Sequence, residues 1–217
     1  MIKKDLKRRI STSIILLALI VLIFEFKIIL VFSLIILGVI SIMEFLKITK
    51  KIIKNNLLFF CSNILFIIYI FLFCLIFLLF SHTYILKLFL FSLLLGCIAS
   101  DIGGFVFGKI FKGPKLTEIS PNKTISGAIG AVFFTCLTIS ILFFSITHSF
   151  NLKILFIGVV NSLACQIGDL FFSYLKRKAK IKDTGNFLPG HGGVLDRLDG
   201  ILLGIPIGLI TIITFLK

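Results

Sequence analysis

Long apolar segments alternate with short polar ones along the chain. Residues 63–80, NILFIIYIFLFCLIFLLF, have no polar face to turn toward water, and several other segments approach the roughly 20 residues that cross a bilayer. Within lipid, a helix satisfies its own backbone hydrogen bonds. The pattern therefore predicts an all-α fold, a polytopic integral membrane helical bundle of seven helices, over residues 10–26, 28–46, 57–80, 84–107, 125–147, 152–175 and 200–216.

The division between the first two segments is the weakest of these boundaries. Only Glu25 and Lys27 interrupt the apolar run there, so a tight hairpin is expected. Residues 1–10, MIKKDLKRRI, resemble the start of a signal peptide. Because no small-residue cleavage site follows, we expect this first segment to be retained as a span.

Basic residues provide an independent test of this topology. With a cytoplasmic N-terminus, seven spans place 19 of the 23 Lys and Arg residues in four cytoplasmic segments, 1–9, 47–56, 108–124 and 176–199. The positive-inside rule thus favours a multi-pass protein of the cell's inner (cytoplasmic) membrane. The net charge of +14 reflects this bias and attraction to anionic lipid headgroups. We expect no nucleic-acid partner, since the chain has no soluble domain and no basic patch interleaved with aromatic residues.

Acidic residues are scarce, which makes those inside apolar segments informative. Asp101 and Asp169 lie within or at the end of apolar runs, where an unpaired charge is costly. Such residues usually face the interior of a bundle and pair with a cation, a substrate, a metal or a nearby Lys or Arg. Asp5, Glu25 and Glu44 lie at segment ends near basic residues, and we interpret them as topology residues only.

Asp196 and Asp199 form a second acidic feature. They are three positions apart and share one face if the last helix begins near Val194. Two like carboxylates repel each other, and a divalent cation relieves that repulsion. Hard oxygen ligands without a Cys or His cluster fit Mg²⁺ better than zinc. The alternative is a helix start decorated with acids that suit the macrodipole.

The segment before this pair, residues 176–193, is rich in Lys, Arg and Gly. Glycines let backbone N–H groups approach a phosphate, a helix N-terminus favours the anion, and basic side chains complete a polyphosphate site. His191 is expected to orient a phosphate, to transfer a proton or to hold the loop. A positive-inside flank remains the alternative for the basic run, and the preferred one for Lys178 and Lys180.

The loop at residues 108–124 is the second polar segment with candidate chemistry. Lys123, Thr124 and Ser126 supply donors just before a span. Its sequence GKIFKGPK is a near miss for a nucleotide-binding P-loop, and we reject that motif because Pro114 occupies the position of the required Lys.

These segments carry a resemblance to a known family. Ser173, Lys176 and Arg177, followed by KDTGNFLPGHGGVLDRLDG over residues 182–200, resemble the signature of the phosphatidate cytidylyltransferase (CDP-diacylglycerol synthase) family. The sequences SDIGGFVFGKIFKGPKL, ISPNKT and QIGDLFFS resemble further motifs of that family, so the resemblance covers about residues 99–204. The family usually has Glu or Gln where this chain has Ser126.

The resemblance implies a nucleotidyltransferase of phospholipid biosynthesis. The implied reaction is CTP + phosphatidic acid → CDP-diacylglycerol + pyrophosphate, in contact with membrane lipids and with the site facing the cytoplasm. One domain over residues 1–217 is expected, with N-terminal membrane helices in 1–98 and the catalytic membrane region in 99–217.

The resemblance also implies a set of site residues. One or two Mg²⁺ ions are expected on Asp169, Asp196 and Asp199. The expected catalytic residues are Asp169, Lys176, Arg177, Lys182, Asp183, His191, Asp196, Arg197 and Asp199. The expected substrate-binding residues are Asp101, Lys123, Thr124, Ser126, Ser173, Gly190, Gly192 and Gly193.

Two other functions are alternatives to this one. A CTP-dependent polyprenol-type lipid kinase would transfer the γ-phosphate to an alcohol, and an ion-coupled membrane transporter would use Asp101 and Asp169 as an ion path. A separate question concerns Gly200, Gly204 and Gly208, whose small-residue face would serve either internal packing or a homodimer.

Overall fold

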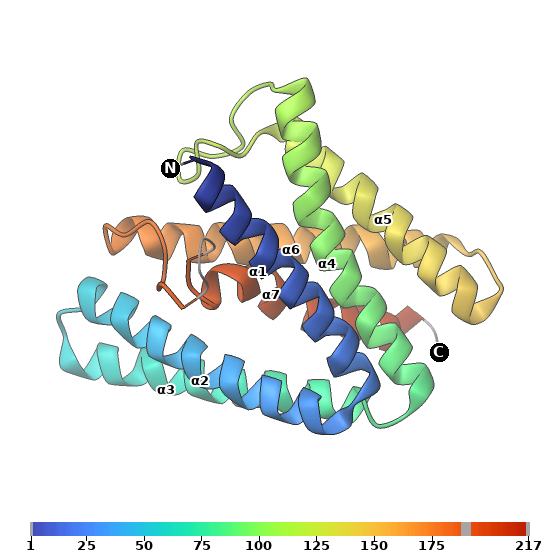
Figure 1. The fold of residues 1–217 in the computed structure, drawn as a ribbon, viewed down its shortest axis with the longest axis horizontal. Helices are drawn as coiled ribbons and strands as arrows, with labels where there is room; N and C mark the ends of the chain where they lie inside the picture. Colours follow the sequence, from blue (N-terminus) through green and yellow to red (C-terminus); the bar gives the residue numbers. More distant parts are fainter. Residues whose placement is uncertain (1, 188–191, 216–217) are drawn as a thin grey trace. The chain divides into compact units, whose positions relative to one another are not determined.

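The computed structural model describes the backbone of residues 2–187 and 192–215, and the side chains of 11–187 and 192–215. Over these residues the chain forms seven α-helices and no strand (Figure 1). The helices are α1 (Ile2–Glu25), α2 (Lys27–Ile52), α3 (Asn56–Phe80), α4 (Tyr84–Phe111), α5 (Ile125–Thr147), α6 (Leu152–Lys178) and α7 (Leu195–Phe215). The all-α prediction is confirmed. The bounds differ most at three places, since α1 begins eight residues earlier than expected, α2 ends six residues later and α7 begins five residues earlier.

Six of these helices, α2 to α7, are long and apolar enough to cross a membrane. In α1 the apolar part among the described side chains is the shorter stretch Ser11–Glu25. Large apolar side chains such as Leu57, Phe71 and Ile141 are exposed, as expected for helices that face lipid rather than water. The protein is therefore a multi-pass helical membrane protein, as the sequence predicts.

The chain divides into two compact units. The first comprises Met1–Leu79 with Leu175–Leu198, and the second comprises Phe80–Tyr174 with Asp199–Lys217. Helices α6 and α7 each contribute residues to both units. The expectation of one domain stays a prediction.

In the first unit, α2 and α3 lie side by side (Figure 1). The rings of Phe45 and Phe66 stack with centroids 3.9 Å apart, and the Thr49 hydroxyl lies 3.0 Å from the Asn63 side-chain oxygen. Phe26 alone separates α1 from α2, and the chain turns at this residue (Figure 1). The connection is as tight as the polar interruption in the sequence suggests.

In the second unit, glycines bring helices into backbone contact. A Cβ atom on Gly103 of α4 would lie 2.5 Å from the carbonyl oxygen of Gly130 in α5. A Cβ atom on Gly168 of α6 would likewise lie 2.5 Å from the carbonyl oxygen of Asp199 in α7. The face of α7 that carries Gly200 packs against α6 in the same chain, so the expected internal packing is observed.

Gly103→Ala is expected to destabilise the second unit, because the added methyl group collides with rigid backbone rather than with a flexible side chain. Overpacking of this kind costs about 1–3 kcal/mol. Gly104→Ala is the matched control, since its Cβ atom would meet its nearest neighbour at 3.7 Å, an ordinary van der Waals distance. Thermal unfolding in detergent should show a lower Tm for Gly103→Ala alone, and equal Tm values for the two variants would contradict the packing described above.

Candidate active site

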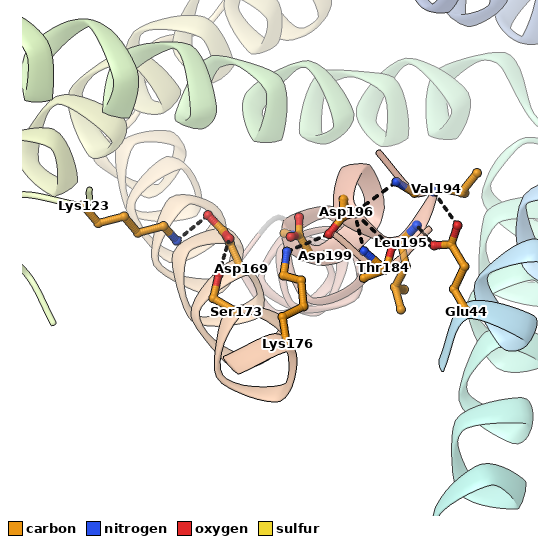
Figure 2. Close-up of polar contacts among 12 residues, drawn as sticks. Glu44, Lys123, Asp169, Ser173, Lys176, Thr184, Val194, Leu195, Asp196 and Asp199 are labelled. Carbon is orange, nitrogen blue, oxygen red and sulfur yellow. Dashed lines mark hydrogen bonds and ion pairs between the residues drawn. The ribbon is translucent and has the colours of Figure 1, made fainter. Parts of the chain in front are cut away.

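The first turn of α7, in the first unit, is capped by a glutamate from α2 (Figure 2). The Glu44 carboxylate accepts hydrogen bonds from the backbone N–H groups of Val194 (3.1 Å) and Leu195 (2.8 Å) and from the Thr184 hydroxyl (2.7 Å). Only 3% of Glu44 is exposed. A helix leaves its first N–H groups without partners inside the helix, and its N-terminus favours negative charge. The Glu44 carboxylate accepts hydrogen bonds from two of these N–H groups and places a negative charge at the N-terminus of α7. It does so although Glu44 lies 150 positions before Val194 in the sequence.

Asp196 is held on both of its carboxylate oxygens (Figure 2). One oxygen accepts a hydrogen bond from the ammonium group of Lys176 at 2.7 Å, and the other accepts from the N–H groups of Thr184 (2.8 Å) and Gly193 (3.0 Å). The side chains of Lys176 and Asp196 are 13% and 7% exposed, so this ion pair is nearly buried. Two of the predicted catalytic residues therefore meet directly.

Glycines close around the Glu44 carboxylate. A Cβ atom on Gly193 would lie 2.5 Å from one of its oxygens, and a Cβ atom on Gly185 would collide with the other. Gly192 has a φ of +85°, a conformation that favours glycine. The predicted glycine-rich loop thus fits tightly around the carboxylates of this chain. Phosphate binding by the loop stays a prediction, and Gly190 and His191 lie outside the described residues.

The second unit contains a pocket of about 230 Å³ walled by α4, α5 and α6. Four predicted site residues line it together, and these are Asp101, Lys123, Thr124 and Asp169. The Lys123 ammonium forms an ion pair with Asp169, which also accepts a hydrogen bond from the Ser173 hydroxyl at 3.3 Å (Figure 2). Lys123 and Asp169 are 26% and 30% exposed at their side chains, so this pair is accessible from solvent.

The loop before α5 places Lys123 at the pocket wall. The Thr124 hydroxyl caps α5 by accepting from the N–H group of Gly127 at 3.1 Å, as is typical of helix starts. The Lys123 carbonyl accepts from the Leu116 N–H group at 2.8 Å, which folds the loop back on itself. The Ser126 hydroxyl donates to the carbonyl of Lys112 and holds this loop, while its predicted role in substrate binding stays a prediction.

The remaining predicted residues differ in how accessible they are. Asp199 is buried in the second unit, and its carboxylate accepts a hydrogen bond from the Gly200 N–H group at 2.9 Å. The other four are exposed residues of the first unit, Arg177, Lys182, Asp183 and Arg197. Exposed cationic side chains on flexible stems suit contact with a phosphate that arrives from solution.

Glu44 is the residue that reasoning from sequence missed. It was interpreted as a topology residue because Lys47 and further basic residues follow it. A signal was available, since Glu44 falls inside the predicted span 28–46, where a charge is costly. The same criterion selected Asp101 and Asp169.

The described residues of each unit were tested for a metal centre. Within either unit, they bring no three His, Cys, Asp or Glu side chains to one point. The donor chemistry nevertheless suits a hard cation, because Asp101 and Asp169 both line the same pocket and carboxylate oxygens are the ligands such a cation prefers. In the first unit, Asp196 uses both oxygens for protein donors.

Known proteins resemble this chain over about half of its length. The phosphatidate cytidylyltransferase of Helicobacter pylori is 44% identical over 126 residues, which are 58% of this chain and 47% of that protein. The enzyme of the same name from Rickettsia felis is 41% identical over 121 residues, 51% of this chain and 53% of that protein. The one from Staphylococcus haemolyticus is 37% identical over 110 residues, 50% of this chain and 42% of that protein.

The chain spans about half the length of the curated relatives it matches. A family model, described as the cytidylyltransferase family, matches residues 1–215. Since that match extends over nearly the whole chain, the protein belongs to the cytidylyltransferase family.

Proposed function

We propose that this chain transfers the cytidylyl group of CTP to phosphatidic acid, giving CDP-diacylglycerol and pyrophosphate. The observation that carries the proposal is the Lys123–Asp169 ion pair in a pocket walled by membrane-spanning helices. A pocket between such helices gives a lipid phosphate and a dissolved nucleotide a common meeting place. The names of the similar proteins support the same reaction.

The reaction requires stabilisation of negative charge more than it requires a strong general base. A phosphate oxygen of phosphatidic acid attacks the α-phosphorus of CTP, and the bond between that phosphorus and the oxygen of the departing pyrophosphate breaks. The attacking phosphate is already anionic at pH 7, so catalysis consists mainly of positioning and of neutralising the negative charge. Lys123 and Lys176 supply positive charge in the second and first units, each paired with a carboxylate that fixes its position.

The pocket volume suggests what binds beside Lys123. At about 230 Å³ it is smaller than the roughly 300–1,000 Å³ of pockets that enclose whole small ligands. We therefore assign it to one part of a substrate, a phosphate group that pairs with the Lys123 ammonium. Thr124, as the cap of α5, fixes the backbone next to that ammonium.

Mg²⁺ is part of this proposal. Asp101 and Asp169 would hold it at the pocket, and Asp196 and Asp199 remain the further candidate ligands from the sequence. When bound, the ion neutralises the charge that develops on the phosphates. Asp169 would then exchange its partner Lys123 for the cation, which frees the ammonium for a substrate phosphate.

The proposed setting is the inner membrane, with the site on the cytoplasmic side. The support is the concentration of Lys and Arg in the four segments expected to be cytoplasmic. CTP is a polyanion that does not cross lipid, so a site on this side reaches the nucleotide directly. A homodimer remains a proposal without a contact that argues for it.

The purified chain in vesicles that contain phosphatidic acid tests the proposal. With CTP and Mg²⁺, we expect CDP-diacylglycerol to accumulate and to be detected by mass spectrometry of the lipid extract. Removing divalent cations with EDTA should stop the reaction, and adding Mg²⁺ should restore it. Full activity in EDTA would refute the metal assignment, and no CDP-diacylglycerol under any condition would refute the function.

A further inference from the structure

We infer that Glu44 is a positioning residue for Asp196, and that it sets turnover by fixing the first turn of α7. The inference rests on the proposed function. It assigns a role to a residue that lies outside the signature over residues 182–200 and that contacts three parts of that signature.

The Glu44 carboxylate lies against two stretches of the loop that surrounds Asp196. Thr184 and Gly185 form the first stretch, and Gly193, Val194 and Leu195 form the second. The space that a side chain on Gly185 or Gly193 would need is filled by the Glu44 carboxylate. Because the loop folds around this carboxylate, its shape depends on Glu44.

Thr184 links Glu44 to Asp196. Its hydroxyl lies 2.7 Å from a Glu44 oxygen and 3.0 Å from an Asp196 oxygen, while its backbone N–H group donates to the same Asp196 oxygen. The hydroxyl has one proton, and the shorter contact to Glu44 receives it. A shift of Glu44 would therefore move Thr184, and with it the backbone N–H group that donates to Asp196.

Glutamine has the same shape as glutamate but cannot accept all three hydrogen bonds that the Glu44 carboxylate accepts. Both carboxylate oxygens of Glu44 accept hydrogen bonds, one from Val194 and the other from Leu195 and Thr184. In Glu44→Gln the amide nitrogen, which is a donor, must face at least one of these donors. The substitution also removes the negative charge from the helix N-terminus.

The test combines hydrogen exchange with steady-state kinetics on the full chain. Glu44→Gln is expected to speed exchange by about tenfold or more at the Val194 or the Leu195 amide, since at least one of them loses its acceptor. In the cytidylyltransferase assay, kcat should fall by about 10- to 100-fold while KM for CTP and for phosphatidic acid changes by less than about threefold. Glu25→Gln is the matched control, because Glu25 is exposed at the end of α1, and it should behave as the unmodified chain does.

Substitutions of Thr184 provide a second test of the inference, which applies even if Glu44→Gln does not fold. Thr184→Val removes the hydroxyl link at nearly constant volume and should lower kcat, while Thr184→Ser keeps the hydroxyl and should restore it. Unchanged exchange in Glu44→Gln, or an unchanged kcat in Thr184→Val, would overturn the inference. If the unmodified chain makes no CDP-diacylglycerol, the proposed function fails, and exchange alone then decides whether Glu44 fixes the first turn of α7.

Discussion

Asp196→Asn is expected to abolish most of the activity and to destabilise the first unit. The carboxylate of Asp196 is nearly buried and takes a hydrogen bond from Lys176 on one oxygen and from two backbone N–H groups on the other. An amide nitrogen in place of either oxygen would face a donor, and Lys176 would lose its neutralising charge. Breaking a buried ion pair by removing one partner costs about 3–5 kcal/mol.

Two measurements separate the consequences for folding and for catalysis. Denaturant unfolding in detergent should show the loss of stability, and turnover at saturating substrate, at a temperature where the variant remains folded, should fall by about 100-fold or more. Glu118→Gln is the control, because Glu118 is exposed in the loop before α5 and should leave both quantities unchanged. An Asp196→Asn protein as stable and as active as the unmodified chain would show that this carboxylate has neither role.

Lys123→Met and Asp169→Asn are expected to lower activity strongly while leaving stability nearly unchanged. Their side chains are 26% and 30% exposed, and pairs that reach solvent contribute only about 0–1 kcal/mol to stability. Tm should therefore change little. Activity should fall by about 100-fold or more in each variant, because both residues line the pocket that we assign to a substrate phosphate.

The charge-swapped variant with Lys123→Asp and Asp169→Lys distinguishes a functional pair from a structural one. It keeps one positive and one negative side chain across the same two positions. A purely structural ion pair would tolerate the exchange, and activity would return. The proposed function predicts that activity stays low, because the ammonium and the carboxylate then lie on the wrong elements. Recovery of turnover in the swapped variant would contradict the assignment.

The sequence predicts the helices well because their cause is local. An apolar run of membrane length can only bury its backbone polar groups as a helix, so each of the seven predicted segments appears as a helix. The bounds differ most where polar residues flank the apolar run, at the start of α1, the end of α2 and the start of α7. The start of α7 at Leu195 lies next to Val194, where the interpretation of Asp196 and Asp199 as one helix face places it. The contact that caps this start comes from Glu44, 150 positions before Val194, and no local pattern in the sequence indicates that contact.

The sequence predicts those parts of the candidate site whose signal is local. Asp101, Lys123 and Thr124 stand out locally, as charge in an apolar run or as donors at a helix start, and the structure places all three on one pocket. Glu44 carries the same local signal as Asp101, a charge within a predicted span, but that signal does not show what Glu44 contacts. Its role becomes visible only when the loop around Gly185 and Gly193 is seen folded around its carboxylate.

The central claim is that the chain moves the α-phosphate of CTP, with its nucleoside, onto a lipid phosphate. The most direct measurement supplies CTP labelled either at the α-phosphate or at the γ-phosphate to the purified chain in phosphatidic acid vesicles. The claim predicts that only the α-label enters the lipid extract, with the γ-label recovered in pyrophosphate in equal amount. Entry of the γ-label into lipid, or of neither label, would contradict it.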